Sequence, residues 1–178
     1  MSAWRPGERR ADRESMLRVD QTGEYGATRI YAGQLAVLRP NCPEAKLIAR
    51  MAAQEERHLK RFNDLMARRR GRPTVLQPLW NVAGFALGAA TALMSEKAAL
   101  ACTDAVETEI DRHYSQQLDE LGNEDPELAA DIAEFRAEEV EHRDTAREAG
   151  AAEAIGYPIL TAAIRAGCRV AIGLSKRI

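Results

Sequence analysis

The sequence contains an internal repeat, and this repeat limits the folds open to the chain more than any other feature. Counted from Glu24 and from Glu107, both halves carry Arg at the fifth following position, Tyr at the seventh and Gln at the tenth. Both then carry Leu at the fourteenth, Pro at the nineteenth and Glu at the twentieth residue after this glutamate. A chain that repeats in this way is expected to fold as two similar units that pack together.

Each half also contains one Glu-x-x-His pair, Glu55 with His58 and Glu139 with His142. The first pair begins 31 residues after the leading glutamate of its half and the second begins 32 residues after, so the halves differ by one residue. A Glu and a His three residues apart lie on one helix face, and a single such pair most often belongs to a solvated surface. Because two of only three histidines occur in this arrangement, at matching places of a repeat, one shared site is the better interpretation.

Helix geometry brings these positions to one level. From Glu24, about 14 residues lead along one helix to a turn, roughly 21 Å at about 1.5 Å per residue. From Pro43, about 12 residues lead back, roughly 18 Å. Hydrophobic residues make up 46% of the chain and aromatic residues only 5%, which favours helix over sheet. We therefore predict an all-α fold with helices over about 20–38, 43–70, 96–121 and 126–149, Asp125 being the N-cap of the last.

Two such helical hairpins facing each other would gather four carboxylates and two imidazoles in one layer. One Glu from each of two helices, plus a Glu-x-x-His from each of the other two, is the inward-facing ligand set of ferritin-like di-iron or di-manganese bundles. A mixed nitrogen and oxygen set without thiolate suits iron, and four carboxylates balance the charge of two divalent ions. The predicted metal ligands are Glu24, Glu55, His58, Glu107, Glu139 and His142.

Neighbouring glutamates are excluded from this set by their place on the helix. Glu56 and Glu141 lie two residues and one residue before a histidine, so they do not share its helix face. Glu109 lies about 200° around the helix from Glu107, which the repeat aligns with Glu24.

The chain is expected to form one ferritin-like domain over residues 1–178, with a flexible arm at 1–15 and pseudo-repeats at about 18–70 and 101–149. Apolar segments at 74–95 and 159–174 stand outside the repeats. The first contains Gly84 and Gly88, a G-x-x-x-G spacing that favours close helix packing. The second carries Arg165 and Arg169, which can extend to lipid headgroups. We expect both segments to lie in or on a membrane near the entrance of the metal site, the alternative being core helices or a dimer interface.

Several stretches resemble the demethoxyubiquinone hydroxylases of ubiquinone biosynthesis. They are RVDQTGEYGATRIYAGQLAVL, QEERHLKRFNDL, ACTDAVETEIDRHYSQQL, FRAEEVEHRD and AGCRVAIGLSKRI, and from the first to the last the resemblance extends over most of the chain. The resemblance implies a non-haem di-iron monooxygenase that hydroxylates the ring of a polyprenylated demethoxyubiquinol with O₂. It also implies a peripheral membrane protein, at the inner face of the bacterial cell membrane or the matrix side of the mitochondrial inner membrane.

The same resemblance implies roles for a His-Tyr pair and for outside partners. His113 and Tyr114 match a pair that the family associates with substrate binding and electron transfer. No G-x-G-x-x-G motif occurs, so no resident cofactor besides two iron ions is expected and electrons come from outside, from NADH or from the quinol itself. The resemblance leaves open whether a lipid-presenting protein partner takes part and whether the chain forms a homodimer.

Other functions are weighed against this one. A ferritin-like iron-storage protein has no use for two apolar segments, and a metal-independent membrane scaffold leaves six ionisable residues unexplained. A rubrerythrin-like peroxidase would carry a C-x-x-C module, whereas the three cysteines are scattered without that spacing. Such a set of cysteines suits a reducing compartment. A formal net charge of −2 gives no reason to expect a nucleic-acid partner.

Overall fold

The computed structural model describes residues 11–178 and is all-helical over that range, as predicted. Four long helices carry the two repeats: α1 (Arg13–Val37), α2 (Pro43–Arg68), α4 (Glu96–Leu121) and α5 (Pro126–Glu148). The described part of the chain also contains two further helices, both apolar, α3 (Gln77–Met94) and α6 (Tyr157–Ser175). A short 3-10 helix, η1 (Ala151–Glu153), precedes α6.

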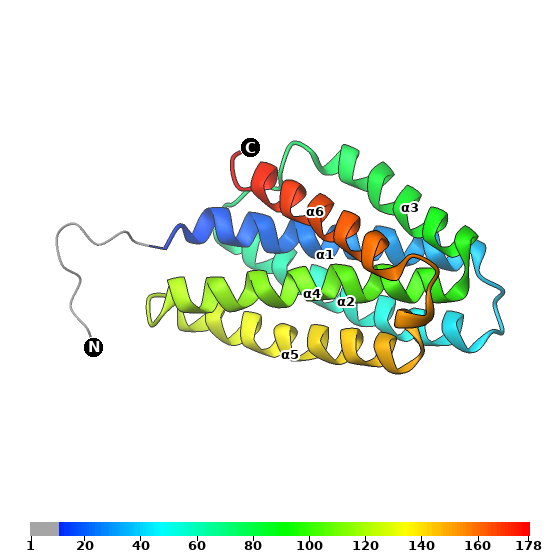
Figure 1. Ribbon diagram of the computed structural model, residues 1–178. Coiled ribbons are helices and arrows are strands. Elements are labelled where there is room, and N and C mark those ends of the chain that lie inside the picture. The colour runs from blue at the N-terminus through cyan, green and yellow to red at the C-terminus, as the bar shows by residue number, and fades with distance from the viewer. Residues whose placement is uncertain (1–10) are drawn as a thin grey trace.

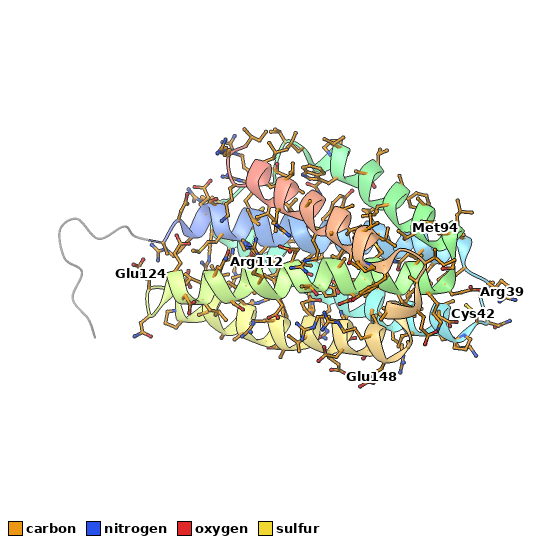
Figure 2. All side chains as sticks on the ribbon, in the orientation of Figure 1. Arg39, Cys42, Met94, Arg112, Glu124 and Glu148 are labelled. Atoms are coloured by element: carbon orange, nitrogen blue, oxygen red, sulfur yellow. The ribbon has the colours of Figure 1, made fainter. Side chains whose placement is uncertain are left out.

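The four long helices form a bundle of two antiparallel hairpins, α1 with α2 and α4 with α5 (Figure 1). The α1–α2 turn beside Cys42 lies at one end of the bundle, and the α4–α5 turn beside Glu124 lies at the other (Figure 2). Helix α3, which connects the two hairpins in the chain, runs back along the outside of α1, so that α4 begins at the end where α2 begins (Figure 1). The two hairpins are therefore antiparallel to each other, with their turns at opposite ends of the bundle.

Apolar residues fill the bundle on both sides of its middle. One buried cluster, at the end with the α4–α5 turn, includes Phe62, Leu65, Leu128 and Ile132. A second, toward the α1–α2 turn, includes Ile48, Met51 and Leu100 together with many alanines. The layer between these two clusters is where the polar residues of the repeat meet.

Side-chain caps fix where the helices of the bundle begin. The predicted cap is confirmed, since Asp125 Oδ1 accepts from the Leu128 backbone N–H at 3.1 Å and Pro126 occupies the first turn of α5. The matching place of the first repeat holds Cys42, whose sulfur accepts from the Ala45 backbone N–H ahead of α2. The same local device therefore starts the returning helix of both hairpins.

The first helix begins earlier than predicted. Helix α1 starts at Arg13, because the Asp12 side chain accepts from the Ser15 backbone N–H and caps it, whereas the predicted start was residue 20. Met16, Leu17 and Val19 of this added stretch are buried in the core. The expected flexible arm at 1–15 is therefore wrong for residues 13–15, and its residues 1–10 lie outside the described part of the chain.

Helix α3 packs on α1 with its backbone almost touching. A Cβ atom added to Gly88 would lie 1.9 Å from the Ile30 carbonyl oxygen, and one added to Gly33 would lie 2.1 Å from the Phe85 carbonyl oxygen. A Cβ at Gly84 would lie 3.0 Å from the Arg29 Cβ. The G-x-x-x-G face is thus covered by α1 of the same chain and does not serve a homodimer.

Polar contacts tie α6 to α4 and to the end of α3. Buried Glu109 accepts from Arg165 Nε at 2.8 Å and lies 3.3 Å from Arg169 NH2. Arg112, on the outer side of α4, also contacts Glu109 (Figure 2). Trp80 Nε1 donates to Ser175 Oγ at 3.2 Å. Arg165 and Arg169, which are expected to be able to extend to lipid headgroups, thus both bind a carboxylate of the bundle in the structure.

The outward faces of α3 and α6 remain apolar and exposed. On α3, Val82 is 68% exposed and Leu93 is 74% exposed, and on α6 the corresponding values are 79% for Ile159 and 60% for Val170. Both helices lie on one side of the bundle, away from α5 (Figure 1). Of the described helices, only α6 is long and apolar enough to cross a membrane, a property that some helices of soluble proteins share.

Candidate metal centre

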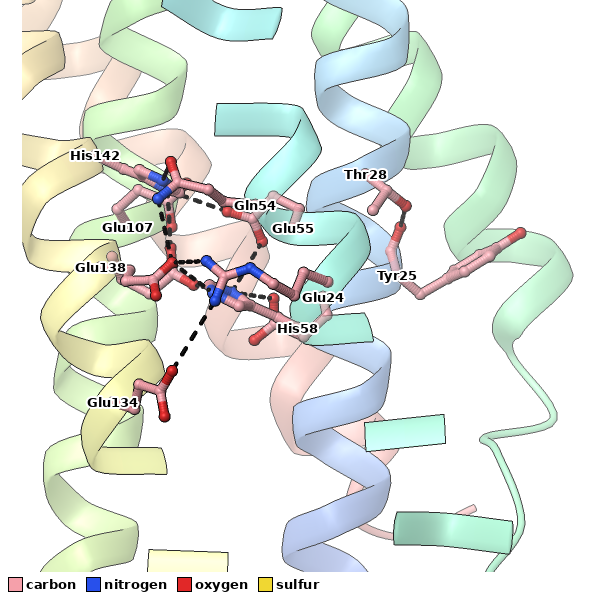
Figure 3. A network of polar contacts seen from close by, with 12 residues as sticks. Glu24, Tyr25, Thr28, Gln54, Glu55, His58, Glu107, Glu134, Glu138 and His142 are labelled. Carbon is pink, nitrogen blue, oxygen red and sulfur yellow. Dashed lines mark hydrogen bonds and ion pairs between the residues drawn. The ribbon is translucent and has the colours of Figure 1, made fainter. Parts of the chain in front are cut away.

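The six predicted ligand side chains meet inside the bundle, at most 2% exposed each. Each of the four long helices supplies its share: α1 and α4 give one glutamate each, and α2 and α5 give one glutamate and one histidine each (Figure 3). They form two overlapping groups whose donor atoms lie within 4.8 Å of one another. The groups are Glu24, Glu55, His58 and Glu139, and Glu55, Glu107, Glu139 and His142.

The two glutamates of the Glu-x-x-His pairs belong to both groups. Glu55 and Glu139 thus occupy the middle of the cluster, where a carboxylate can offer one oxygen to each of two neighbouring ions. Glu24 with His58, and Glu107 with His142, stand on either side of them. The arrangement offers two four-donor positions that share two carboxylates.

Both imidazole rings turn the Nδ1 atom toward the carboxylates. His58 Nδ1 lies 3.1 Å from Glu139 Oε1 and 3.4 Å from Glu24 Oε2. His142 Nδ1 lies 3.1 Å from Glu55 Oε1 and 3.2 Å from Glu139 Oε2. The His58 ring stacks on Phe135, with ring centroids 4.1 Å apart, which limits rotation of the ring. The two nitrogens best suited to bind a metal therefore face the same layer.

Burial and mutual repulsion make this layer costly as a set of free carboxylates. Burial, and next the charge of Glu139, raise the pKa of Glu55 and of Glu107 well above its ordinary value. Burial also raises the pKa of Glu139, to about 7. Burial alone would lower the pKa of His58, but hydrogen bonds to Glu139 and Glu24 raise it to about 10. Bound cations would relieve the repulsion among carboxylates whose pKa values are shifted this strongly.

The pattern of unsatisfied atoms gives an independent test of fit. Buried polar atoms without a hydrogen-bond partner gather in this layer: Glu24 Oε2, both carboxylate oxygens of Glu55, Glu107 Oε2, Glu139 Oε2 and His142 Nδ1. Native proteins leave few buried polar atoms unpaired. Five oxygens and one nitrogen at one place match the donors that divalent iron or manganese accepts, so the residues fit a pair of such ions.

Two tyrosines hold the outer glutamates. The Tyr31 hydroxyl donates to Glu107 Oε1 at 2.7 Å, and the Tyr114 hydroxyl donates to Glu24 Oε1. Both tyrosines are almost fully buried, and both stand at the seventh position after the leading glutamate of their own repeat. Each tyrosine therefore binds the glutamate of the opposite repeat.

The His-Tyr pair divides between two places. Tyr114 touches the cluster through Glu24, whereas His113 faces Asp20, with 3.5 Å between His113 Nε2 and Asp20 Oδ1. Asp20 is fully buried, and burial raises its pKa. Among the contacts of the described residues, Tyr114 reaches the cluster and His113 does not.

The excluded glutamates point elsewhere. Glu56 and Glu141 are exposed on the outside of the bundle, and Glu109 binds the arginines of α6. The distinction that the sequence predicts between Glu107 and Glu109 thus corresponds to two different partners in the structure.

Sequence reasoning missed three residues that touch the cluster from outside, namely Tyr31, Gln54 and Glu138. Gln54 and Glu138 contact the outer nitrogens of the two histidines. The repeat contains a signal for Tyr31, because it stands opposite Tyr114 at the matching position. The signal for the other two is also in the repeat, since each immediately precedes the glutamate of a Glu-x-x-His pair.

Comparison with known proteins agrees with this site. A model of the family described as ubiquinone biosynthesis protein COQ7 matches residues 11–175. A protein of Rhodospirillum rubrum named 3-demethoxyubiquinol 3-hydroxylase is 54% identical over 165 residues, covering 93% of this chain and 78% of that protein. A human protein named NADPH-dependent 3-demethoxyubiquinone 3-hydroxylase, mitochondrial, is 52% identical over 173 residues, covering 95% of this chain and 79% of its own length.

A more distant relative extends the similarity to yeast. The Saccharomyces cerevisiae protein named 5-demethoxyubiquinone hydroxylase, mitochondrial, is 42% identical over 181 residues, covering 93% of this chain and 78% of that protein. The match to the family model spans both repeats, α3 and α6. This chain belongs to the COQ7 family of ubiquinone biosynthesis proteins.

Proposed function

We propose that this chain is a 3-demethoxyubiquinol 3-hydroxylase, a non-haem di-iron monooxygenase that adds a hydroxyl group to the ring of a polyprenylated demethoxyubiquinol with O₂. The names of relatives that are 54% and 52% identical over nearly the whole chain support the reaction. The observation that carries the proposal is the buried layer of four glutamates and two histidines with two overlapping donor groups. A metal-independent scaffold would leave these buried groups without a role.

The ligands that we propose for the two ions follow the two donor groups. Glu24 and His58 would hold one ion, Glu107 and His142 would hold the other, and Glu55 and Glu139 would bind both. Two iron ions would supply the activation of O₂ that ring hydroxylation requires, with electrons from an external reductant. The chain contributes orientation of the ligands, through the tyrosine hydroxyls, and exclusion of water, through the apolar clusters on both sides.

We propose that Tyr114 takes part in the reaction and that His113 supports it from the next position. Support comes from the family resemblance and from the contact of the Tyr114 hydroxyl with Glu24. His113 and Tyr114 stand on α4 with ring centroids 6.2 Å apart. The electrons come from an external reductant. The family resemblance implies NADH or the quinol, and the names of the human, mouse and rat relatives specify NADPH.

We propose that the exposed apolar faces of α3 and α6 rest on a membrane that contains the substrate. A polyprenylated quinol dissolves in lipid, and two neighbouring apolar faces on one side of the molecule offer a surface for peripheral binding. Ala27, Ile30, Val106 and Glu107 line a narrow internal gap between α1 and α4, so that apolar side chains border the cluster at Glu107. The membrane would be the bacterial cell membrane at its inner face or the mitochondrial inner membrane at its matrix side.

The direct test removes, one at a time, the two ligands that belong only to the Glu107 and His142 position. Glu107→Ala and His142→Ala are each expected to abolish hydroxylation of demethoxyubiquinol in vesicles and to lower the iron content, with helix content by circular dichroism unchanged. Glu56→Ala is the matched control, because Glu56 is exposed next to Glu55. Turnover by either ligand variant at the rate of the control would refute the proposed function.

A further inference from the structure

The outer nitrogen of each histidine has its own partner. His58 Nε2 lies 3.0 Å from Glu138 Oε2, and His142 Nε2 lies 2.9 Å from Gln54 Oε1. With each Nδ1 facing the carboxylate layer and bound to a metal there, each Nε2 would carry a proton and donate it to this partner. Such a bond fixes both the tautomer and the angle of the ring.

These partners are exchanged between the repeats. Gln54 immediately precedes Glu55 and Glu138 immediately precedes Glu139, so the two occupy the same place in the two Glu-x-x-His segments. Gln54 on α2 binds the histidine of α5, and Glu138 on α5 binds the histidine of α2. Gln54 Nε2 also donates to Glu138 Oε2 at 3.2 Å, so the two histidine partners are bound to each other (Figure 3).

The exchange is not symmetric in chemistry. The tyrosine hydroxyls repeat the same group on both sides, but the histidine partners are a carboxylate on one side and a neutral amide on the other. An imidazole that donates to a carboxylate is a more basic ligand than one that donates to an amide oxygen. Arg57 NH2 lies 2.6 Å from the same Oε2 of Glu138 and helps to keep that carboxylate charged and in place.

We propose that Glu138 and Gln54 are positioning residues that make the two iron positions unequal, with the stronger donor set at the His58 position. This inference rests on the proposed di-iron function. It predicts a difference in iron affinity between two positions whose ligands, taken alone, are of the same types. The iron site formed by Glu24 and His58 should therefore bind ferrous iron more tightly and fill first. The position of Glu107 and His142 should fill second.

The experiment replaces the carboxylate by the amide that already stands at the matching place. Glu138→Gln keeps shape and hydrogen bonding but removes the charge. Ferrous iron is titrated against a chelator, and the diferrous protein is measured by ⁵⁷Fe Mössbauer spectroscopy. Wild-type protein is expected to bind iron in two resolved steps and to show two distinct quadrupole doublets. Glu138→Gln is expected to weaken the first step about 10- to 100-fold and to shift one doublet while the other stays.

Two further variants complete the design. Glu141→Gln removes an exposed carboxylate three residues along the same helix, and is expected to match wild type in both measurements. Gln54→Leu removes the amide, and is expected to change mainly the second binding step and the other doublet, since Glu138 keeps Arg57 as a partner.

Two results would overturn the inference. In one, Glu138→Gln binds both irons with wild-type affinities and an unchanged spectrum. In the other, Glu138→Gln weakens both steps equally. Neither result touches the proposed function, which fails separately if the wild-type chain binds no pair of irons or forms no hydroxylated product.

Discussion

At the scale of single residues, the cluster is a set of groups that are each unfavourable to bury alone. Four carboxylates with at most 1% exposure would repel one another strongly if all were ionised. Burial raises the pKa of Glu139 to about 7, so the metal-free chain keeps protons on some of these carboxylates. Divalent ions would replace those protons, so metal binding and proton release are coupled.

This coupling predicts how the stability of the metal-free protein depends on pH. A carboxyl group whose folded pKa is raised above 4.5 stabilises the fold at low pH, and that stability is lost as pH rises through the folded value. Glu55, Glu107 and Glu139 all act in this direction, and so does His58, whose pKa is raised from 6.5 to about 10. We expect the Tm of the metal-free protein to fall between about pH 5.5 and about pH 8.

One group opposes this trend. Burial lowers the pKa of His142, so its contribution to stability rises as pH increases through 6.5, but it stands against four groups. Thermal unfolding followed by circular dichroism across that range is the measurement. Ferrous iron should raise the Tm most at the higher pH, because fewer protons then compete with it. A Tm that rises with pH in the metal-free protein would contradict this account of the cluster.

The two buried tyrosines offer a matched comparison for the reaction itself. Tyr31 and Tyr114 make the same bond to equivalent glutamates of opposite repeats. If both only hold a ligand, Tyr31→Phe and Tyr114→Phe should lower turnover alike. Because we propose that Tyr114 also takes part in the reaction, Tyr114→Phe should lower kcat at least about 10-fold more than Tyr31→Phe, a difference of about 1.4 kcal/mol in the barrier. Iron content should be equal in the two variants, and equal kcat values would argue for a purely supporting role.

Residue-level chemistry was largely readable from the sequence because the repeat supplied pairs of positions to compare. Glu107 could be separated from Glu109 by its angle on the helix, and the structure places the first in the cluster and the second on α6. Gln54 and Glu138 were not foreseen. Each contacts a histidine far along the chain, 88 residues away for Gln54 and 80 for Glu138, and only comparison of the two repeats, not a local pattern, could have suggested such a contact.

At the scale of helices, α3 depends on glycine where two backbones touch. Gly88→Ala would place a Cβ 1.9 Å from the Ile30 carbonyl oxygen, and neither backbone can move without separating α3 from α1. We expect this substitution to lower the free energy of unfolding by about 1–3 kcal/mol, the usual range for overpacking. Urea unfolding followed by circular dichroism gives the value.

Gly173→Ala is the matched control for that experiment. Gly173 lies in α6 with nothing within 4 Å of an added Cβ, and alanine there should stabilise the helix by about 0.5–1 kcal/mol. If Gly88→Ala proved as harmless as Gly173→Ala, the close approach of α3 to α1 would be wrong.

Helix boundaries were predictable where the sequence marks them chemically. Helix α4 begins and ends at the predicted residues, Glu96 and Leu121, because Ser95 caps its start and Gly122 follows its end with a positive φ of 49°. Helix α1 was placed seven residues too late, since its first turns carry charges typical of a solvated arm and only the packed bundle shows that Met16 and Leu17 are buried. The partners of Arg165 and Arg169 were likewise unreadable without knowing which face of α4 meets α6.

At the scale of the whole molecule, the two antiparallel hairpins are joined by pairs of equivalent contacts, in which a residue of each repeat binds a residue of the other. Besides the tyrosines and histidines, Gln34 donates to the Ala99 carbonyl at 2.9 Å and Gln117 donates to the Met16 carbonyl at 3.4 Å. Gln34 and Gln117 match in the repeat, and Ala99 and Met16 each stand eight residues before a leading glutamate. Each repeat therefore supplies what the other lacks, which explains why one repeat alone would not hold the site.

The apolar side of the molecule predicts how it binds lipid. Val82→Glu with Leu93→Glu on α3, and Ile159→Glu with Val170→Glu on α6, place charges on side chains that are at least 60% exposed. Each double variant is expected to reduce flotation with liposomes several-fold without changing the Tm, because charged groups are costly to bring into the lipid interface. Ala130→Glu with Ala133→Glu on α5 is the control on the opposite side, and should float as the wild type does. Flotation unaffected by all three pairs would refute membrane binding through α3 and α6.

The central claim, that six distant side chains form one dinuclear iron site, is tested most directly by anomalous diffraction at the iron edge. Crystals grown with ferrous iron should show two anomalous peaks inside the bundle. One should lie between Glu24 and His58 and the other between Glu107 and His142, with Glu55 and Glu139 contacting both. A single peak, or peaks only on the protein surface, would contradict the account.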